Sequence, residues 1–148
     1  MRQLDRLNCD LLNQLGDRTY APGKWTVKEI IQHVIDWERI LTYRALLNAR
    51  SEPAAQQNID QIRLAENSDI DGRTIDSLVE ELMAVRLATK FLFESLNDES
   101  SLRTEISWEY EVPVLAMGFT MIGHQIHHLR VIEEKYYPLT LNGIWQSA

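Results

Sequence analysis

Residues 123–130 read Gly-His-Gln-Ile-His-His-Leu-Arg, and this stretch determines how the rest of the chain is interpreted. It contains three of the four histidines of the chain, His124, His127 and His128. His124 and His128 are four residues apart, so on a helix they lie one above the other on a single face. The fourth histidine, His33, lies far upstream. We therefore expect one helix that carries a histidine pair and a second helix that brings a third histidine to it.

The histidine pair lies within the apolar stripe of its helix. At 100° per residue, Met117 and Met121 fall within about 60° of His124, whereas His127 lies toward the edge of the stripe. His33 also has apolar neighbours at helical spacing, namely Ile30, Trp37 and Ile40. Histidines from both segments are therefore expected to point into the interior of the protein.

Apolar residues at three- and four-residue spacing predict helices over residues 1–15, 26–50, 74–96 and 112–137. The second helix opens with Thr26-Val27-Lys28-Glu29, which fits a capping box, and the third opens with Thr74, a good N-cap. Gly16 and Pro138 are expected to stop the first and the last helix. Pro113 is suited to the first turn of the last helix.

Two connections separate the later helices. Residues 51–73 are polar, have room for a short helix near 59–65, and are numerous enough to cross from one end of a bundle to the other, which would make the second and third helices parallel. Residues 101–111 are expected to be irregular or extended. The sequence thus predicts an all-α fold, with residues 1–148 forming a single domain built as a four-helix bundle with a long crossover between helices two and three.

The charge of the chain limits its partners. With 15 basic and 22 acidic residues, the formal net charge is −7, which argues against binding to nucleic acid or to anionic membranes. No apolar run is long enough to span a bilayer, and the N-terminus lacks the apolar core of a signal peptide. The one cysteine, Cys9, cannot form an intramolecular disulfide and suits a reducing compartment. We therefore expect a cytoplasmic protein.

The three inward-facing histidines favour a metal site. A single buried histidine is usually a core residue with a hydrogen-bond partner, but burying three imidazoles among apolar residues is costly without a shared partner. His33, His124 and His128 are therefore predicted to hold one divalent metal ion. Neutral imidazoles suit Zn²⁺, Ni²⁺, Cu²⁺ or Fe²⁺ better than Mg²⁺ or Ca²⁺, and we expect zinc, nickel or iron. Three histidines leave a coordination position open, which is typical of catalytic sites.

Three polar residues near the predicted ligands allow two interpretations each. Asp36, one turn after His33, is a candidate acceptor that would fix the tautomer of a ligand ring. It is equally well interpreted as a solvated carboxylate near Arg39 or as the partner of a residue on its own helix. Gln125 and His127 could line the mouth of the site, although solvated helix surface is the simpler interpretation of both.

Two motifs carry a resemblance to a known family. Gly23-Lys24-Trp25-Thr26-Val27-Lys28-Glu29-Ile30, followed by His33 and Asp36-Trp37-Glu38-Arg39, resembles the opening of the DinB-like family. Residues 123–129 resemble the closing motif of that family, and the similarity extends over nearly the whole chain. The resemblance implies a four-helix bundle with a long crossover and a divalent metal on the three histidines already named. Many relatives have Glu at the position of Gln125, and the glutamine removes a possible acid or base beside the metal.

The functions of the DinB-like family set the functional expectation. Its members include thiol-dependent transferases and isomerases, hydrolases, and proteins linked to stress, and many form homodimers. The resemblance therefore implies a metal-dependent enzyme of the thiol-transferase or hydrolase type, acting as a homodimer on a small molecule such as a low-molecular-weight thiol. It names no catalytic residue beyond the ligands. The alternative is a non-catalytic metal-binding protein of the stress response. A nucleic-acid-associated damage-response factor would conflict with the acidic charge.

Overall fold

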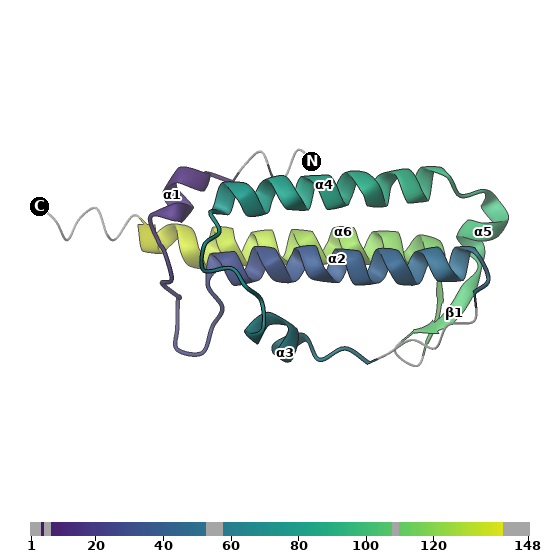
Figure 1. Ribbon diagram of the computed structural model, residues 1–148, viewed down its shortest axis with the longest axis horizontal. Helices are drawn as coiled ribbons and strands as arrows, with labels where there is room; N and C mark the ends of the chain where they lie inside the picture. The colour runs from purple at the N-terminus through teal and green to yellow at the C-terminus, as the bar shows by residue number, and fades with distance from the viewer. Residues whose placement is uncertain (1–3, 5–6, 53–57, 108–109, 141–148) are drawn as a thin grey trace, which may run out of the picture.

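The computed structural model describes residues 4, 7–52, 58–107 and 110–140. Three long helices lie side by side and form most of the molecule (Figure 1). In chain order the elements are α1 (Cys9–Asn13), α2 (Val27–Ala49), α3 (Gln61–Glu66), α4 (Ile75–Glu94), α5 (Asp98–Leu102), β1 (Thr104–Ser107), β2 (Tyr110–Pro113), α6 (Val114–Val131) and the π-helical segment η2 (Ile132–Tyr136). Within the described residues, no helix combines the length and the apolarity needed to cross a membrane.

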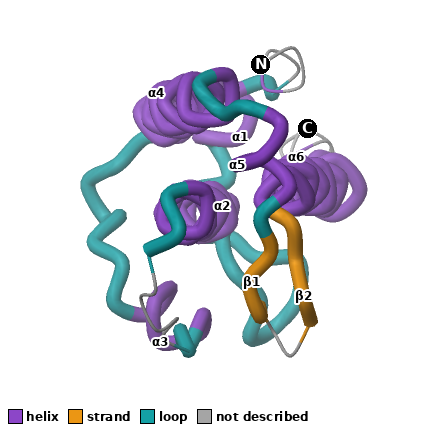
Figure 2. Tube along the Cα trace, turned by 90° about the vertical axis from the view of Figure 1, so that its right-hand side faces the viewer, coloured by secondary structure: helices purple, strands orange, loops and turns teal. Residues whose placement is uncertain are grey.

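The central helix of the bundle is α2, which contacts both α4 and α6. Viewed end-on, the three helices occupy the corners of a triangle, with α3 lying outside it (Figure 2). The crossover returns the chain to the end where α2 begins, so α4 runs parallel to α2, and α6 runs back in the opposite direction (Figure 1). The predicted helical fold with a long crossover is therefore confirmed, and the short α3 lies where the sequence left room for it.

The predicted starts of the second and third helices are also confirmed. The Thr26 hydroxyl accepts a hydrogen bond from the Glu29 backbone N–H at 3.2 Å, and the Thr26 N–H donates to the Glu29 carboxylate at 2.6 Å, which completes the capping box. The Thr74 hydroxyl accepts from the Ser77 N–H at 3.2 Å. Both caps satisfy backbone donors that the first turn of a helix leaves without partners.

The first helix is shorter than the prediction of residues 1–15. Residues 1–3 and 5–6 lie outside the described residues, and α1 begins only at Cys9, because Asn8 acts as its N-cap and accepts from the Leu11 N–H at 3.0 Å. Gly16 follows the helix with φ +57°, a conformation that suits glycine, as expected of a helix stop. Asn13 then attaches α1 to α4, since its side chain accepts from the Ile75 N–H at 2.9 Å.

The connection between α4 and α6 is more regular than predicted. It contains the short helix α5, and the segment expected to be irregular or extended forms an antiparallel hairpin in which Thr104 pairs with Pro113 and Ser107 pairs with Tyr110. The prediction that Pro113 lies in the first turn of the last helix was wrong. Strand pairing holds Pro113 at ψ 147°, and α6 begins one residue later, at Val114.

The prediction that Pro138 stops the last helix was also wrong. After α6 the chain widens into the π-helical segment η2, where the Tyr137 N–H donates to the Ile132 carbonyl, and helical structure then continues to Thr140. A proline ring crowds the helical turn that precedes it. The wider π-helical turn immediately before Pro138 gives that ring room, so the helix continues through the proline.

The interior of the bundle contains two apolar clusters. The first lies near the start of α2 and includes Ile31, Ile35, Leu78, Leu82 and Ile132. The second lies toward the end of α2 and includes Leu41, Ala45, Val114, Met117 and Met121. Along α2 the boundary between the two clusters falls near Glu38, which is itself buried, and it is close to this boundary that the histidines meet.

Candidate metal centre

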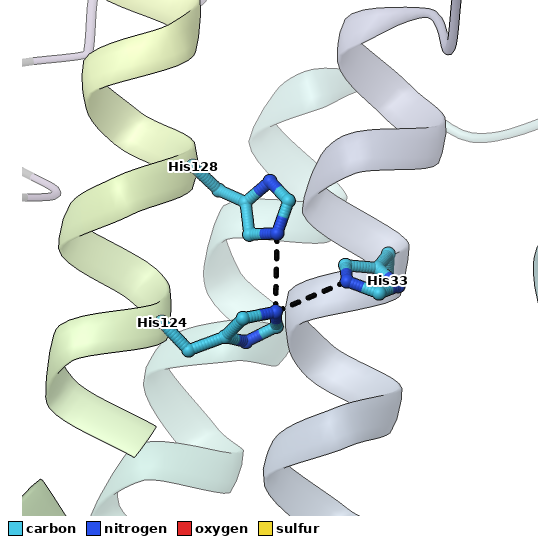
Figure 3. Close-up of side chains that lie close together, drawn as sticks. All are labelled: His33, His124 and His128. Carbon is cyan, nitrogen blue, oxygen red and sulfur yellow. Dashed lines mark hydrogen bonds between the residues drawn. The ribbon is translucent and has the colours of Figure 1, made fainter. Parts of the chain in front are cut away.

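The structure brings His33, His124 and His128 together. His33 projects from α2, and the other two project from successive turns of α6 (Figure 3). The Nε2 atom of His124 lies 3.1 Å from Nε2 of His33 and 3.0 Å from Nε2 of His128. The centroids of the His33 and His128 rings are 4.8 Å apart. In the described part of the chain this is the one cluster of three histidine, cysteine or acidic side chains close enough to share a cation.

The contacts of His124 are better explained by a shared cation than by hydrogen bonds. A ring nitrogen carries either one proton or one lone pair in the ring plane, so Nε2 of His124 cannot form two well-aligned hydrogen bonds to two other nitrogens. Two nitrogens that each lie about 2.0–2.1 Å from one zinc ion are about 2.9 Å apart at a right angle and about 3.4 Å apart at the tetrahedral angle. The observed separations of 3.0 and 3.1 Å fall within this range. The three ligand atoms all lie within 4.8 Å of one another, and imidazole nitrogens are donors that suit a divalent transition metal, so the donor set is of a kind that binds such an ion.

The surroundings keep the three imidazoles neutral. Burial, followed by the proximity of His124, lowers the pKa of His33 to about 4. Burial and the neighbouring histidines lower the pKa of His128 to about 3. Burial also lowers the pKa of His124, with a smaller contribution from His127. Neutral imidazole is the form that binds metals, so the site is ready for a cation near neutral pH.

A cavity gives access to the histidines. It has a volume of about 390 Å³, and its walls include His128, His127, Trp25, Tyr20 and Tyr136. The Trp25 ring lies 4.7 Å from the His33 ring, centroid to centroid. Volumes of this size are typical of sites for small molecules. The cluster is therefore open to a ligand on the side of His128.

Asp36 does not act as the predicted acceptor within the described contacts. Its Oδ1 atom accepts a hydrogen bond from Gln32 at 2.8 Å and lies 3.8 Å from Nη1 of Arg39. Both partners belong to α2, so the interpretation in which Asp36 interacts within its own helix is the correct one. Burial raises the pKa of the Asp36 carboxyl, and the hydrogen bond from Gln32 opposes this effect.

Gln125 and His127 have different positions. His127 is exposed, its ring lies 5.0 Å from the His128 ring, and it lines the cavity. Both interpretations of His127 therefore hold, since it is a surface residue that also lines the cavity. The interpretation of Gln125 as solvated surface was wrong, because its side chain is only 4% exposed. Its Oε1 accepts from Nη2 of Arg86 at 2.9 Å, and the same Arg86 nitrogen donates to Oε2 of Glu38 at 2.8 Å. Gln125 thus points into the bundle instead of the cavity.

Sequence reasoning missed the aromatic side of the site. The hydroxyl of Tyr136 donates to the backbone carbonyl of Trp25, which ties the loop before α2 to η2. Burial raises the pKa of Tyr136 to about 12, so this hydroxyl stays protonated and remains a donor. Tyr20 contacts the Tyr136 ring edge-on, with centroids 5.4 Å apart. One signal was available, since Tyr136 lies eight residues after His128, close to the same helical face.

Comparison with known proteins identifies a family and a similar structure. The sequence model described as the DinB superfamily matches residues 8–132. The fold is similar to that of YfiT from Bacillus subtilis, with a TM-score of 0.72 and 19% sequence identity over 93% of this chain and 84% of that one. YfiT is described as a probable metal-dependent hydrolase with an unusual four-helix bundle topology. A search of curated protein sequences finds no match.

Proposed function

The chain belongs to the DinB superfamily, and from this premise we propose that it is a metal-dependent hydrolase whose single divalent cation is held by His33, His124 and His128. One observation carries the proposal, namely the convergence of three neutral imidazoles, one of which, His128, lines an open cavity. The description of YfiT as a probable metal-dependent hydrolase points in the same direction.

The roles of the residues follow from their positions. The Nε2 atoms of the three histidines supply lone pairs from two helices, and the cavity beside His128 leaves room for a substrate or for water. A bound divalent cation would supply Lewis acidity, which lowers the pKa of water and polarises a substrate oxygen. Trp25, Tyr20 and Tyr136 offer flat apolar walls to a planar part of the substrate. Lys24 at the rim offers a positive charge to an anionic part.

Transfer of a low-molecular-weight thiol is the second candidate. The described residues that line the cavity include no carboxylate, and Gln125 points away from it. Hydrolysis at this site would therefore proceed without a carboxylate base. A thiol has an ordinary pKa of about 8.5 and loses its proton far more readily than water, so thiol transfer needs less help from a base.

Metal content tests the ligand assignment. We expect about one divalent ion per purified chain, zinc, nickel or iron, and its loss in His124→Ala. His127→Ala is the matched control, because His127 lies on the same helix but is exposed and is not a member of the cluster, so it should be dispensable for metal binding. Elemental analysis after exhaustive dialysis gives the answer. Equal metal content in both variants, or protein that never takes up metal, would remove the proposal.

Activity assays separate the two reaction types from a non-catalytic role. The metal-loaded protein is incubated with a panel of small esters and amides, and separately with a thiol and an electrophile. Ester or amide cleavage that His124→Ala abolishes supports hydrolysis, whereas thiol consumption that requires the electrophile supports transfer. A protein that binds metal tightly, holds no exchangeable water in relaxation measurements with a paramagnetic ion and turns over neither panel would instead be a structural or stress-sensing metal protein.

A further inference from the structure

The cavity beside His128, here called the histidine cavity, differs in charge from the rest of the chain. The chain has 22 acidic and 15 basic residues, yet the described residues that line this cavity include one lysine, Lys24, and no acidic side chain. None of the ion pairs in the described part of the chain involves Lys24. The acidic residue of the adjoining turn, Glu29, instead accepts from the Thr26 N–H in the capping box. Such a lining favours anionic ligands over cationic ones.

The loop that carries Lys24 is held on both sides. The Lys24 N–H donates to the Ala21 carbonyl at 3.2 Å, and Gly23, at the third position of this turn, has φ +71°, which glycine adopts without strain. On the other side, the carbonyl of Trp25 accepts from the Tyr136 hydroxyl. Because the loop is already fixed, it presents a positive charge and an aromatic ring together with little ordering cost on binding.

Aromatic rings form much of the wall next to this charge. Trp25, Tyr20 and Tyr136 all line the histidine cavity, and Tyr20 meets the Tyr136 ring edge-on with centroids 5.4 Å apart. Aromatic rings favour offset-stacked or edge-on contacts with a further ring. An aromatic ligand therefore gains more from this wall than a saturated ligand of the same size.

The crossover adds an apolar side chain to the histidine cavity. Ile62 of α3 lines it, although 57% of its surface is exposed. The helix α3 lies outside the triangle of the three long helices, so this contact reaches the cavity from the crossover (Figure 2). An exposed apolar side chain at a cavity is stabilised when an apolar ligand covers it. The cavity volume of about 390 Å³ is within the range of sites that enclose small organic molecules.

From these observations we infer that the histidine cavity selects a small aromatic compound that carries an anionic group, of which an aryl carboxylate is the simplest example. The anion binds at Lys24, and the ring lies against the aromatic wall and Ile62. Lys24 and Ile62 are thus specificity-determining residues, and neither belongs to the predicted metal ligands. As a statement of the substrate class, the inference rests on the proposed function. As a statement about binding, it can be tested without any turnover.

Calorimetric titration of the metal-loaded protein with three probes tests the inference. The probes are 2-naphthoate, its neutral counterpart 2-naphthamide, and the saturated decahydronaphthalene-2-carboxylate. The protein should bind 2-naphthoate more tightly than either of the others, by about threefold to fivefold. Lys24→Gln should abolish the preference over 2-naphthamide. Lys28→Gln is the matched control, because it removes the same charge four residues later, outside the described lining, and should keep the preference.

A second variant tests the contact from the crossover. Ile62→Ser should weaken the binding of all three probes by a similar factor, because it removes apolar contact and no charge. Equal affinity of the wild type for the three probes would overturn the inference, and so would identical behaviour of Lys24→Gln and Lys28→Gln. An unchanged affinity of Ile62→Ser for every probe would contradict the role of Ile62.

The variant His124→Ala separates this inference from the proposed function. The preference for 2-naphthoate should persist in this metal-free protein, because Lys24 recognises the anion. If the preference is lost in His124→Ala but kept in Lys24→Gln, the anion binds the cation and the inference is wrong. Selective binding by a metal-loaded protein that cleaves no ester or amide would remove the proposed function and leave the inference standing. Metal-dependent cleavage without selection for aromatic anions would give the reverse.

Discussion

His124 is the residue on which the candidate site depends most. It is the middle member of the cluster, and its Nε2 atom is the one that both other rings approach. The sequence alone indicated this convergence, because the i, i+4 pair and the distant His33 each lie on an apolar helical face. Their role as metal ligands stays a prediction until metal is measured. Glu38 and Arg86 carry no comparable signal in the sequence, since charged residues of helices are normally solvated.

The lowered pKa values predict how the metal-free protein responds to acid. His33 has a pKa of about 4 in the folded state and about 6.5 when unfolded, so the unfolded chain binds more protons between these pH values. The free energy of unfolding should therefore be highest above pH 6.5 and fall as the pH drops toward 4. One such proton contributes a slope of up to about 1.4 kcal/mol per pH unit.

Chemical denaturation of chelator-treated protein at a series of pH values measures this slope. His33→Gln removes one of the shifted groups and should flatten the curve between pH 6.5 and 4, while exposed carboxylates contribute equally to both proteins. Parallel curves for the two proteins would show that burial of His33 does not disfavour its protonated form.

At the level of helices and strands, the N-caps of α2 and α4 were predictable, whereas the positions of Pro113 and Pro138 relative to the last helix were not. Thr26 and Thr74 could be identified as N-caps because a hydroxyl with a donor two or three residues ahead is a local feature. Pro113 and Pro138 were misjudged because their surroundings are not local. The first is held by strand pairing in the hairpin, and the second is accommodated by a π-helical turn that no pattern in the sequence announces. Errors therefore occur where tertiary or unusual backbone geometry overrides local preference.

The capping box of α2 should contribute more to the free energy of unfolding than the single cap of α4. Thr26→Ala removes the acceptor of the Glu29 N–H and should lower the free energy of unfolding by about 1 kcal/mol, up to about 2. Thr74→Ala removes one cap bond without a reciprocal partner and should cost less. Urea denaturation of both variants at one protein concentration checks the order. An equal cost, or a larger cost for Thr74→Ala, would contradict the special role of the capping box.

On the scale of the whole molecule, a buried cluster of three polar side chains, here called the polar group, joins the three long helices. Glu38 of α2 is 2% exposed and contacts Arg86 of α4 through two oxygens, at 2.7 and 2.8 Å, while Gln125 of α6 accepts from the same arginine. Burying polar side chains of this kind between apolar clusters lowers the stability of the fold unless every one of them has a hydrogen-bond or ion-pair partner. This arrangement fixes how α2, α4 and α6 are aligned along their length.

Removing one member of this polar group should destabilise the protein more than replacing all three members by apolar residues. Arg86→Met leaves the Glu38 carboxylate buried without its cation and should lower the free energy of unfolding by about 3–5 kcal/mol. Combining it with Glu38→Met and Gln125→Met replaces all three polar side chains by apolar ones of similar length and should recover most of that loss. Urea denaturation of the single and triple variants makes the comparison. A triple variant less stable than Arg86→Met would mean that the polar group itself stabilises the fold.

The separation of His33 from His124 in the chain, 91 residues, has a consequence for when the candidate site exists. Residues this far apart meet only after α2 and α6 have packed together, so the set of three imidazoles is a product of folding. An unfolded chain offers the three rings separately, and a separate imidazole would bind a divalent cation only weakly. Assembly of the bundle and of the donor set would then be one event.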